Sequence, residues 1–275
     1  MVKKQKNNRT YISIIIPAYQ QEKTIQKDIR HIRDVMNQIR SKYEIIVVID
    51  GFIDNTYQKA KKIKSKNITI IGYQNNKGKG YAVRYGMAKA KGNIIAFIDS
   101  GMDINPNGIN MLLEHFKWYN ADIIVGSKLH PVSKVNYPVI RRILSWCYRT
   151  LVKILFGLSI RDTQVGIKFF RKKVLDDVLP RLEITTYAFD IELLAVAHSL
   201  GYRRIYEAPI ELDFKNSSSI TSKTFWRVIF SMLKDTFIVY YKLKIFNHYK
   251  QKTRKHIYRN SKNIIKRKKI HYLGA

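Results

Sequence analysis

The sequence is poor in cysteine, in acidic residues and in long apolar runs. Its single cysteine, Cys147, permits no internal disulfide, which fits a reducing cytoplasm. The apolar stretch after the basic start MVKKQKNNRT stops at Pro17, too soon for the core of a signal peptide. Charged side chains interrupt the later apolar stretches, so no membrane-spanning helix is expected. We therefore predict a protein without an export signal.

Acidic residues are scarce: 20 Asp and Glu stand against 51 Lys and Arg, a formal net charge of +31. Such an excess favours a polyanionic partner, whether nucleic acid, an anionic membrane or a phosphorylated substrate. No Asp or Glu follows Asp235, whereas Lys and Arg crowd the remaining residues. No nucleic-acid-binding motif occurs, so no specific nucleic-acid partner is predicted.

Short β-rich apolar runs alternate with helical stretches from Tyr11 to Lys128. The apolar runs are continuous rather than alternating, which is typical of strands covered on both faces. The pattern predicts an α/β fold with a doubly wound, mostly parallel sheet. Ligands bind such sheets at the carboxyl ends of the strands. Three polar clusters fall at those ends, in residues 17–22, 50–54 and 99–103.

Composition divides the chain into four parts. Residues 1–10 are a basic extension, 11–212 the α/β domain, 213–246 an amphipathic helical region and 247–275 a basic tail. The helical region has apolar residues at helical spacing with charged residues between them. We therefore predict that it lies on a membrane surface without crossing it. Its apolar face comprises Trp226, Ile229, Phe230, Leu233, Phe237 and Tyr241.

Four segments resemble the inverting glycosyltransferases of family 2. They are SIIIPAYQQEKTI, EIIVVIDGFIDNT, NKGKGYAVRYGMAKAKGNIIAFID and RDTQVGIKFFR, in the order and spacing of that family. The chain is similar to the branch of dolichyl-phosphate mannose synthases and glucosyltransferases from about Tyr11 to Leu212. This resemblance implies a GT-A fold, a nucleotide-diphosphosugar donor, a divalent metal (Mg²⁺ or Mn²⁺) and a polyprenyl-phosphate acceptor.

The resemblance assigns several residues to the nucleotide. Asp50 matches the aspartate that accepts hydrogen bonds from the base, which suits the ring N–H of uracil or guanine. The chain departs from the family at Phe52 and at Gln20-Gln21, where a serine and an Asn-Glu pair are usual. A structural role for Asp50, as a helix cap or turn residue, stays open. The predicted nucleotide-binding residues are Pro17, Ala18, Tyr19, Glu22, Asp50, Lys79, Arg84 and Asp99, with Lys79 and Arg84 directed at the phosphates.

The metal motif of the family is altered in this chain. Asp99 ends an apolar run, but Gly101 stands where Asp-x-Asp has its second carboxylate. The resemblance implies that Asp103 takes over, so that Asp99 and Asp103 hold the ion together with oxygens of the diphosphate. Gly101→Asp would restore the usual motif. The alternative is that Asp103 only caps the helix beginning near Pro106.

The resemblance also names catalytic and acceptor residues. Asp190 in AFDIEL lies where relatives with hydroxyl acceptors keep a general base, so Asp99, Asp103 and Asp190 form the predicted catalytic set; capping of a helix is the alternative for Asp190. A phosphate nucleophile is largely ionised near neutral pH, since its second pKa is about 6, and needs no strong base. The residues predicted to meet the acceptor phosphate are Lys128, Arg141, Arg142, Asp162, Thr163, Gln164 and Arg171. A solvated basic face is the alternative for each lone cation.

The leading hypothesis is an enzyme that moves a hexose from a UDP- or GDP-sugar onto a polyprenyl or dolichyl phosphate with inversion. It would lie peripherally on the anionic cytoplasmic face of a membrane. A membrane-protein partner is left open, because related enzymes carry transmembrane helices. One alternative is a family 2 enzyme with a saccharide or another lipid as acceptor. Another is a basic nucleic-acid- or membrane-binding protein on an inactive GT-A fold, which the altered residues Gly101, Gln21 and Phe52 favour.

Overall fold

The computed structural model of the protein describes residues 10–101, 104–130, 139–186, 188–211 and 222–245. Of residues 139–143, 145, 222–228 and 245 it describes the backbone alone. Asp103, most of the predicted N-terminal extension and the whole predicted basic tail lie outside the described residues.

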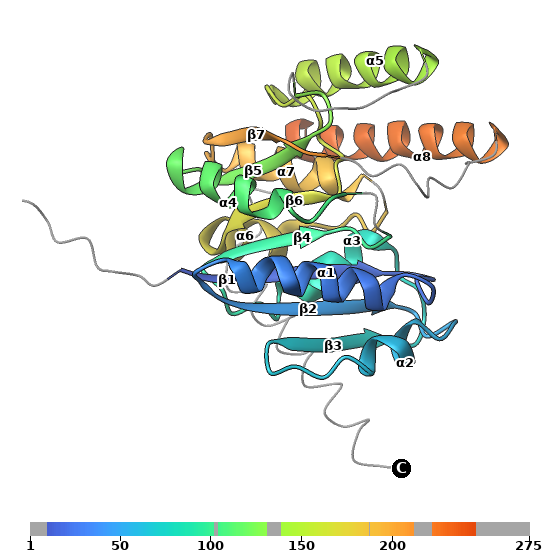
Figure 1. Ribbon diagram of the computed structural model, residues 1–275. Helices are drawn as coiled ribbons and strands as arrows, with labels where there is room; N and C mark the ends of the chain where they lie inside the picture. The colour runs from blue at the N-terminus through green and yellow to red at the C-terminus, as the bar shows by residue number, and fades with distance from the viewer. Residues whose placement is uncertain (1–9, 102–103, 131–138, 187, 212–221, 246–275) are drawn as a thin grey trace, which may run out of the picture.

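The described residues form one sheet with the strand order β3-β2-β1-β4-β6-β5-β7. All neighbouring strands run parallel except at β6, which is antiparallel to both β4 and β5. The mostly parallel sheet predicted from the apolar runs is therefore confirmed (Figure 1). The strands are β1 (Tyr11–Ala18), β2 (Lys42–Asp50), β3 (Ile68–Tyr73), β4 (Ile94–Ile98), β5 (Ile123–Ser127), β6 (Ile167–Arg171) and β7 (Ile205–Pro209).

Helices connect and cover the strands. Each helical stretch expected between the first five strands is present. The chain ends its described part in a long helix followed by a short π-helical turn at Tyr241–Ile245. The helices are α1 (Ile25–Gln38), α2 (Thr56–Lys61), α3 (Lys79–Met87), α4 (Gly108–Trp118), α5 (Val139–Phe156), α6 (Lys172–Val178), α7 (Phe189–Ser199) and α8 (Ser222–Tyr240).

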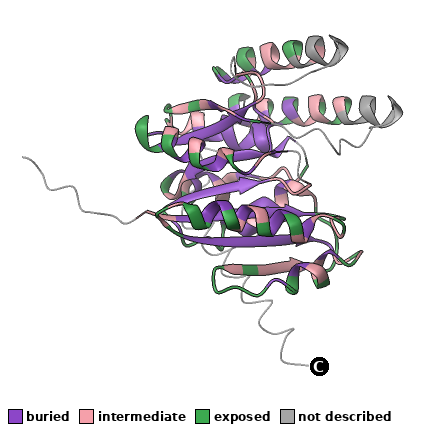
Figure 2. Cartoon of the chain, in the orientation of Figure 1, coloured by how far each residue is buried: buried purple, intermediate pink, exposed green. Residues whose placement is uncertain are grey.

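The core lies between the sheet and the helices on its faces. The strands β1, β2 and β4 are buried along almost their whole length, as Figure 2 shows by their purple colour. On α1 the buried side chains recur every three or four residues, so one stripe of this helix faces the sheet. Helix α3 packs closely on β1 and β2 because Gly86 has no side chain: a Cβ there would lie 2.4 Å from Ile15 Cγ2.

The carboxyl ends of β1, β2 and β4 meet at one edge of the sheet because these strands are parallel. The reversed strand β6 adds its amino-terminal end to the same edge, since Ile167 pairs with Ile98 at the end of β4. The backbone N–H of Asp99 donates to Gly166 O at 2.8 Å and extends this pairing by one step. The polar clusters after β1, β2 and β4 are therefore brought together.

Candidate active site

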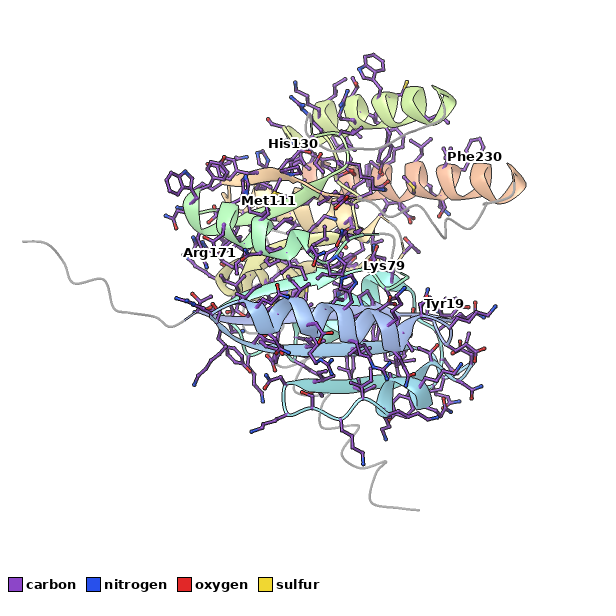
Figure 3. The ribbon with its side chains drawn as sticks, in the orientation of Figure 1. Tyr19, Lys79, Met111, His130, Arg171 and Phe230 are labelled. Carbon is purple, nitrogen blue, oxygen red and sulfur yellow. The ribbon has the colours of Figure 1, made fainter. Side chains whose placement is uncertain are left out.

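Asp99 lies directly after β4 and is paired with a lysine from the next layer. Lys79 Nζ, at the first position of α3, is 2.7 Å from Asp99 Oδ2. The carboxylate fits here because residue 166 is glycine: a Cβ at Gly166 would lie 2.2 Å from Asp99 Oδ2. Lys79 is labelled near the middle of the sheet edge in Figure 3.

A second carboxylate faces the same lysine from α7. Asp190 is only 3% exposed, and its Oδ2 is 3.7 Å from Lys79 Nζ. Its Oδ1 is 2.6 Å from the Nζ of Lys168, a fully buried lysine of β6 that also donates to Val165 O at 2.7 Å. Lys79, Asp99, Lys168 and Asp190 thus form one charge cluster, with two carboxylates and two ammonium groups.

The two lysines of the charge cluster differ in their electrostatic surroundings. For Lys79, burial lowers the pKa, but the charges and hydrogen bonds of Asp99 and Asp190 outweigh it and raise the pKa above its ordinary value. For Lys168, burial is the larger effect and lowers the pKa, although Asp190 opposes it. Lys79 therefore stays charged beside Asp99 at neutral pH.

Asp190 does not cap helix α7. The N-cap residue is Ala188, no side chain bonds the first turn, and the Asp190 carboxylate points to lysines instead. The capping alternative for Asp190 is therefore wrong. Its partner Lys168 cannot be predicted from the sequence, because a lysine in an apolar strand carries no local signature of what it pairs with.

Asp99 retains one oxygen that fits a metal ion. Its Oδ1 is buried and has no hydrogen-bond partner among the described residues. The described residues hold no group of three or more His, Cys, Asp or Glu side chains that could bind a metal. The predicted second ligand, Asp103, is outside the described residues. The described part of the site thus offers a single carboxylate, which suits an ion that takes most of its ligands from a diphosphate.

Asp50 lies at the end of β2 and is 2% exposed. Its Oδ1 accepts from the Tyr73 hydroxyl at 2.8 Å and from Lys77 N at 2.7 Å, and its Oδ2 accepts from Asn76 Nδ2 at 3.0 Å. Burial of Tyr73 and its hydrogen bond to Asp50 raise the pKa of the Tyr73 hydroxyl. Two carboxylate oxygens offer four acceptor sites, so one site on Oδ2 is left. Asp50 therefore shapes the loop after β3, and its predicted contact with a base stays a prediction.

The loop after β1 is held against the ends of β2 and β4. Pro17 O accepts from the Ser100 hydroxyl at 2.8 Å, and Glu22 Oε2 accepts from Asn55 N at 3.3 Å. Ala18 ends β1 in the core, whereas Tyr19 is 44% exposed at the sheet edge (Figure 3). The structure thus brings residues 17–22 to the same edge as Asp50 and Asp99.

Arg84 lies one turn further along α3 than Lys79 and faces other acids. Burial lowers its pKa, and the charges of Glu192 and Glu183 act in the opposite direction. The carboxylate of Glu192 also accepts from the backbone N–H of Glu183 at 2.9 Å and of Ile184 at 2.9 Å. The predicted contact of Arg84 with the donor phosphates stays a prediction.

The predicted acceptor loop lies between α5 and β6. Asp162 Oδ2 accepts from Lys128 N at 3.1 Å, which joins the loop to the end of β5. Thr163 is buried, and Gln164 Nε2 lies 3.6 Å from the sulfur of Met232 on α8. Four of the predicted acceptor residues are thereby brought together. Arg141 and Arg142 lie at the start of α5, where the side chains are outside the described part.

Arg171 is not brought to this edge. It pairs with Ile94 at the beginning of β4, because β6 runs antiparallel and carries its last residue away from Asp99. Its guanidinium donates to Ala121 O at 2.7 Å and lies over the Phe116 ring. Figure 3 shows Arg171 at the opposite end of the sheet from Lys79. Its position in the sequence next to the acceptor loop was misleading, and we withdraw the assignment.

Helices α5 and α8 lie side by side, joined by a hydrogen bond of 2.9 Å between the Tyr148 and Thr236 hydroxyls (Figure 1). Both helices have exposed residues, green in Figure 2, and several of these are large and apolar. No helix in the described ranges is long and apolar enough to cross a membrane. The exposed residues, which we name the helix-pair surface, are Trp146, Ile154, Phe230, Phe237, Ile238 and Tyr241.

Comparison with known sequences places the chain in a family. The family described as Glycosyl transferase family 2 matches residues 13–179, which is more than half of the chain. The chain belongs to glycosyl transferase family 2. The resemblance noted in the four sequence segments is therefore confirmed.

Curated relatives of this family 2 protein include two dolichyl-phosphate beta-glucosyltransferases. The Dictyostelium discoideum protein is 27% identical over 206 residues, covering 70% of this chain and 63% of that protein. The Drosophila melanogaster protein is 31% identical over 205 residues, covering 69% of this chain and 63% of that protein. The chain thus spans less than two thirds of the length of these two relatives.

Solved structures share the fold. Glucosyl-3-phosphoglycerate synthase from Mycobacterium tuberculosis, crystallised with Mn²⁺, uridine diphosphate and phosphoglyceric acid, superposes with a TM-score of 0.62. The match covers 85% of this chain and 78% of the synthase at 18% identity. This likeness confirms the predicted GT-A fold.

Proposed function

We propose that this family 2 protein transfers a hexose from a nucleotide-diphosphosugar to the phosphate of a polyprenyl lipid, with inversion at the sugar carbon. The observation that carries the proposal is the meeting of three parts at one sheet edge. These are the Asp50 loop, the charge cluster around Asp99 and the loop of residues 162–164. The similarity to dolichyl-phosphate beta-glucosyltransferases and the uridine diphosphate bound by solved neighbours support glucose and uridine as the first donor to test.

On the donor side, the remaining acceptor site of Asp50 receives a ring N–H of the base. Lys79 presents an ammonium that binds the diphosphate as a point charge. Asp99 Oδ1, buried and without a partner among the described residues, would hold Mg²⁺ or Mn²⁺. When bound, such an ion supplies positive charge to the leaving nucleoside diphosphate.

On the acceptor side, the nucleophile is a phosphate oxygen that is already ionised near neutral pH. Asp190 has its two oxygens directed at Lys168 and Lys79, which favours a role as their counter-ion over that of a general base. Lys128, together with the loop of residues 162–164, receives the acceptor phosphate. Arg141 and Arg142 are proposed for the same role from sequence alone.

We propose that the helix-pair surface binds the membrane that contains the lipid acceptor. Its apolar side chains enter the interfacial region, while Lys234 and Lys244, both exposed on the same helical segment, meet anionic headgroups. Helix α8 contacts the acceptor loop through Met232 and Gln164, so the membrane and the acceptor phosphate lie next to each other. This arrangement supports a peripheral position on a membrane; the cytoplasmic face is proposed from the sequence alone.

The test is transfer by the purified full-length protein from uridine diphosphate glucose to polyprenyl phosphate in detergent, with Mn²⁺. The expected product is a glucosyl phosphoryl lipid in which the anomeric configuration of the donor is inverted, as nuclear magnetic resonance can report. Parallel reactions contain guanosine diphosphate mannose, or a saccharide in place of the lipid. Transfer to the saccharide without transfer to the lipid phosphate would contradict the proposed acceptor. Nucleotide binding without any transfer would favour an inactive family member.

A further inference from the structure

We infer that Lys79 is the resident cation of this site, which neutralises Asp99 until a divalent metal and a diphosphate arrive together. The metal ion then displaces the ammonium from Asp99, and the ammonium moves to the phosphates. The inference rests on the proposed donor class. It adds that the metal ion binds weakly without the nucleotide and tightly together with it.

The geometry makes Lys79 the movable member of the charge cluster. Its side chain is 23% exposed and its Nζ lies 2.7 Å from one carboxylate and 3.7 Å from the other. Lys168 has a fully buried side chain and is fixed between Asp190 and Val165 O. A lysine has a flexible stem, so Lys79 can exchange one anion for another without a change in the backbone.

The backbone around Lys79 is held in place, which limits the exchange to the side chain. Gly80 N donates to Thr185 O at 2.9 Å. A Cβ at Gly78 would lie 2.5 Å from Thr185 O, and one at Gly80 would lie 2.6 Å from Phe189 Cβ. Both neighbours of Lys79 are therefore pressed against the segment that leads into α7.

The charges of the cluster explain why metal and diphosphate are coupled. Asp99 and Asp190 carry two negative charges, and Lys79 and Lys168 carry two positive ones, so the cluster is balanced as it stands. A divalent ion placed on Asp99 alone meets an ammonium 2.7 Å from the same carboxylate and is repelled by it. A diphosphate supplies the missing negative charge and gives the displaced Lys79 a new partner.

The altered metal motif agrees with this assignment. Where relatives have a second carboxylate, this chain has Gly101. Among the described residues, the ammonium of Lys79 is in contact with Asp99 and balances its charge. The Oδ1 atom of Asp99, which has no hydrogen-bond partner among the described residues, stays available for the ion that accompanies the nucleotide.

The test measures Mn²⁺ binding directly, through the loss of the electron paramagnetic resonance signal of free Mn²⁺, with and without uridine diphosphate. Three full-length proteins are compared: the parent, Lys79→Met and Lys89→Met. Methionine keeps the length of the side chain and removes its charge. Lys89 is exposed near the end of the α3 region and lies over the Tyr85 ring, so Lys89→Met controls for the change in net charge alone.

The Lys79→Met variant is expected to bind Mn²⁺ without nucleotide about tenfold more tightly than the parent, because a charge beside Asp99 is removed. Its gain in Mn²⁺ affinity on adding uridine diphosphate is expected to shrink, whereas Lys89→Met behaves as the parent does. Unchanged affinity for Mn²⁺ alone in a folded Lys79→Met protein would overturn the inference.

Two further arms keep the result decisive. Lys79→Arg retains the charge and is expected to leave Mn²⁺ binding without nucleotide as weak as in the parent. In the parent itself, equal affinity for Mn²⁺ with and without uridine diphosphate would refute the inference, whether or not Lys79→Met folds. A parent protein that binds no nucleotide at all would refute the proposed donor. The metal-only arm uses no nucleotide, so it decides the role of Lys79 separately.

Discussion

The sheet edge around Asp99 and the helix-pair surface differ in how their functional side chains are held. At the sheet edge, charged groups are packed between strands and helices, and most of their oxygens and nitrogens have partners within 3 Å or little more. The apolar side chains of the helix-pair surface, by contrast, are exposed to solvent and have no such constraint. Trp146, Ile154, Phe230, Phe237 and Tyr241 are each between 50% and 75% exposed.

This difference indicates two kinds of recognition. At the sheet edge, the proposed diphosphate would meet charges set on a rigid backbone, with the Lys79 side chain as the movable group, which lowers the reorganisation needed on binding. A lipid surface has no fixed shape, so exposed apolar and basic residues on two helices suffice. Substitutions at the sheet edge should therefore change stability and chemistry, whereas substitutions on the helix pair should change only membrane binding.

The largest effect is expected from Lys168→Met. This change leaves Asp190 in the core with only Lys79, 3.7 Å away, as a counter-ion. Breaking one partner of a buried pair costs about 3–5 kcal/mol, and the free energy of unfolding in urea should fall by this amount.

The matched control is Lys172→Met, which removes an exposed lysine paired with Asp176 on α6 and should cost less than about 1 kcal/mol. The double variant Lys168→Met with Asp190→Leu should recover part of the stability, because no charge is then left buried without a partner. A Lys168→Met protein as stable as the parent would show that the cluster is more open to water than its burial indicates.

The next effect concerns the chemistry. Asp99→Asn keeps the shape of the side chain but removes the charge that pairs with Lys79 and that we propose binds the metal. We expect turnover to fall about 10²-fold or more, the usual result of losing one preorganised electrostatic group, with little change in thermal stability. Asp34→Asn, on the exposed face of α1, is the control for a lost carboxylate. Full activity with normal Mn²⁺ dependence in Asp99→Asn would place any metal elsewhere.

A smaller effect, on membrane binding, is expected from substitutions on the helix-pair surface. Replacing both Phe230 and Phe237 by serine should weaken binding to vesicles with anionic lipid roughly tenfold, since each ring loses part of the 1.5–3 kcal/mol gained on full burial. Nucleotide affinity should stay unchanged. Trp118→Ser removes an exposed aromatic residue of α4, outside the helix pair, and should not affect sedimentation with vesicles. An equal loss in the Trp118 variant would mean that the contact is not specific to α5 and α8.

Most of the sheet could be predicted from the sequence because its strands are continuous apolar runs, such as the one that ends at Ile98. The direction of β6 could not, since a short strand shows its residues but not which neighbour it pairs with. That gap misplaced Arg171, which sits at the far end of the sheet. The alternation of strands and helices predicts parallel strands, and parallel strands end at the same edge. This was enough to predict that Asp50 and Asp99 lie at one edge.

The contacts within the site were less predictable. The resemblance directed Lys79 to the donor phosphates, but its pairing with Asp99, 20 residues away, depends on how α3 packs on β1 and β2, next to β4. Lys168 and Asp190 are 22 residues apart and belong to different elements. The sequence around either residue does not predict that the two pair. Likewise the partners of Asp50 are distant in sequence: Tyr73 is the last residue of the neighbouring strand β3, and Lys77 lies in the loop after it.

The smallest effect is expected at Gly101. Here the sequence and the structure lead to different expectations for the substitution Gly101→Asp. The sequence alone predicts that Gly101→Asp restores an Asp-x-Asp motif. In the structure, however, Gly101 has a φ of +112°, a conformation that side-chain-bearing residues rarely adopt, and its N–H donates to Asp28 Oδ2 at 3.0 Å. We expect Gly101→Asp to lower the free energy of unfolding by about 1–3 kcal/mol through backbone strain, without tightening Mn²⁺ binding.

Gly101→Ala separates the two contributions, because it introduces the same strain without a carboxylate. There is space for a Cβ at Gly101, with the Gln21 amide nearest at 3.8 Å, so a loss of stability in the alanine variant reports conformation rather than a clash. Gly108→Ala, at the start of α4, tests an ordinary helical glycine and should be neutral or slightly stabilising. If Gly101→Asp were as stable as the parent and bound Mn²⁺ more tightly, the turn after β4 would be free to rearrange. The sheet edge would then share the tolerance assigned above to the helix pair alone.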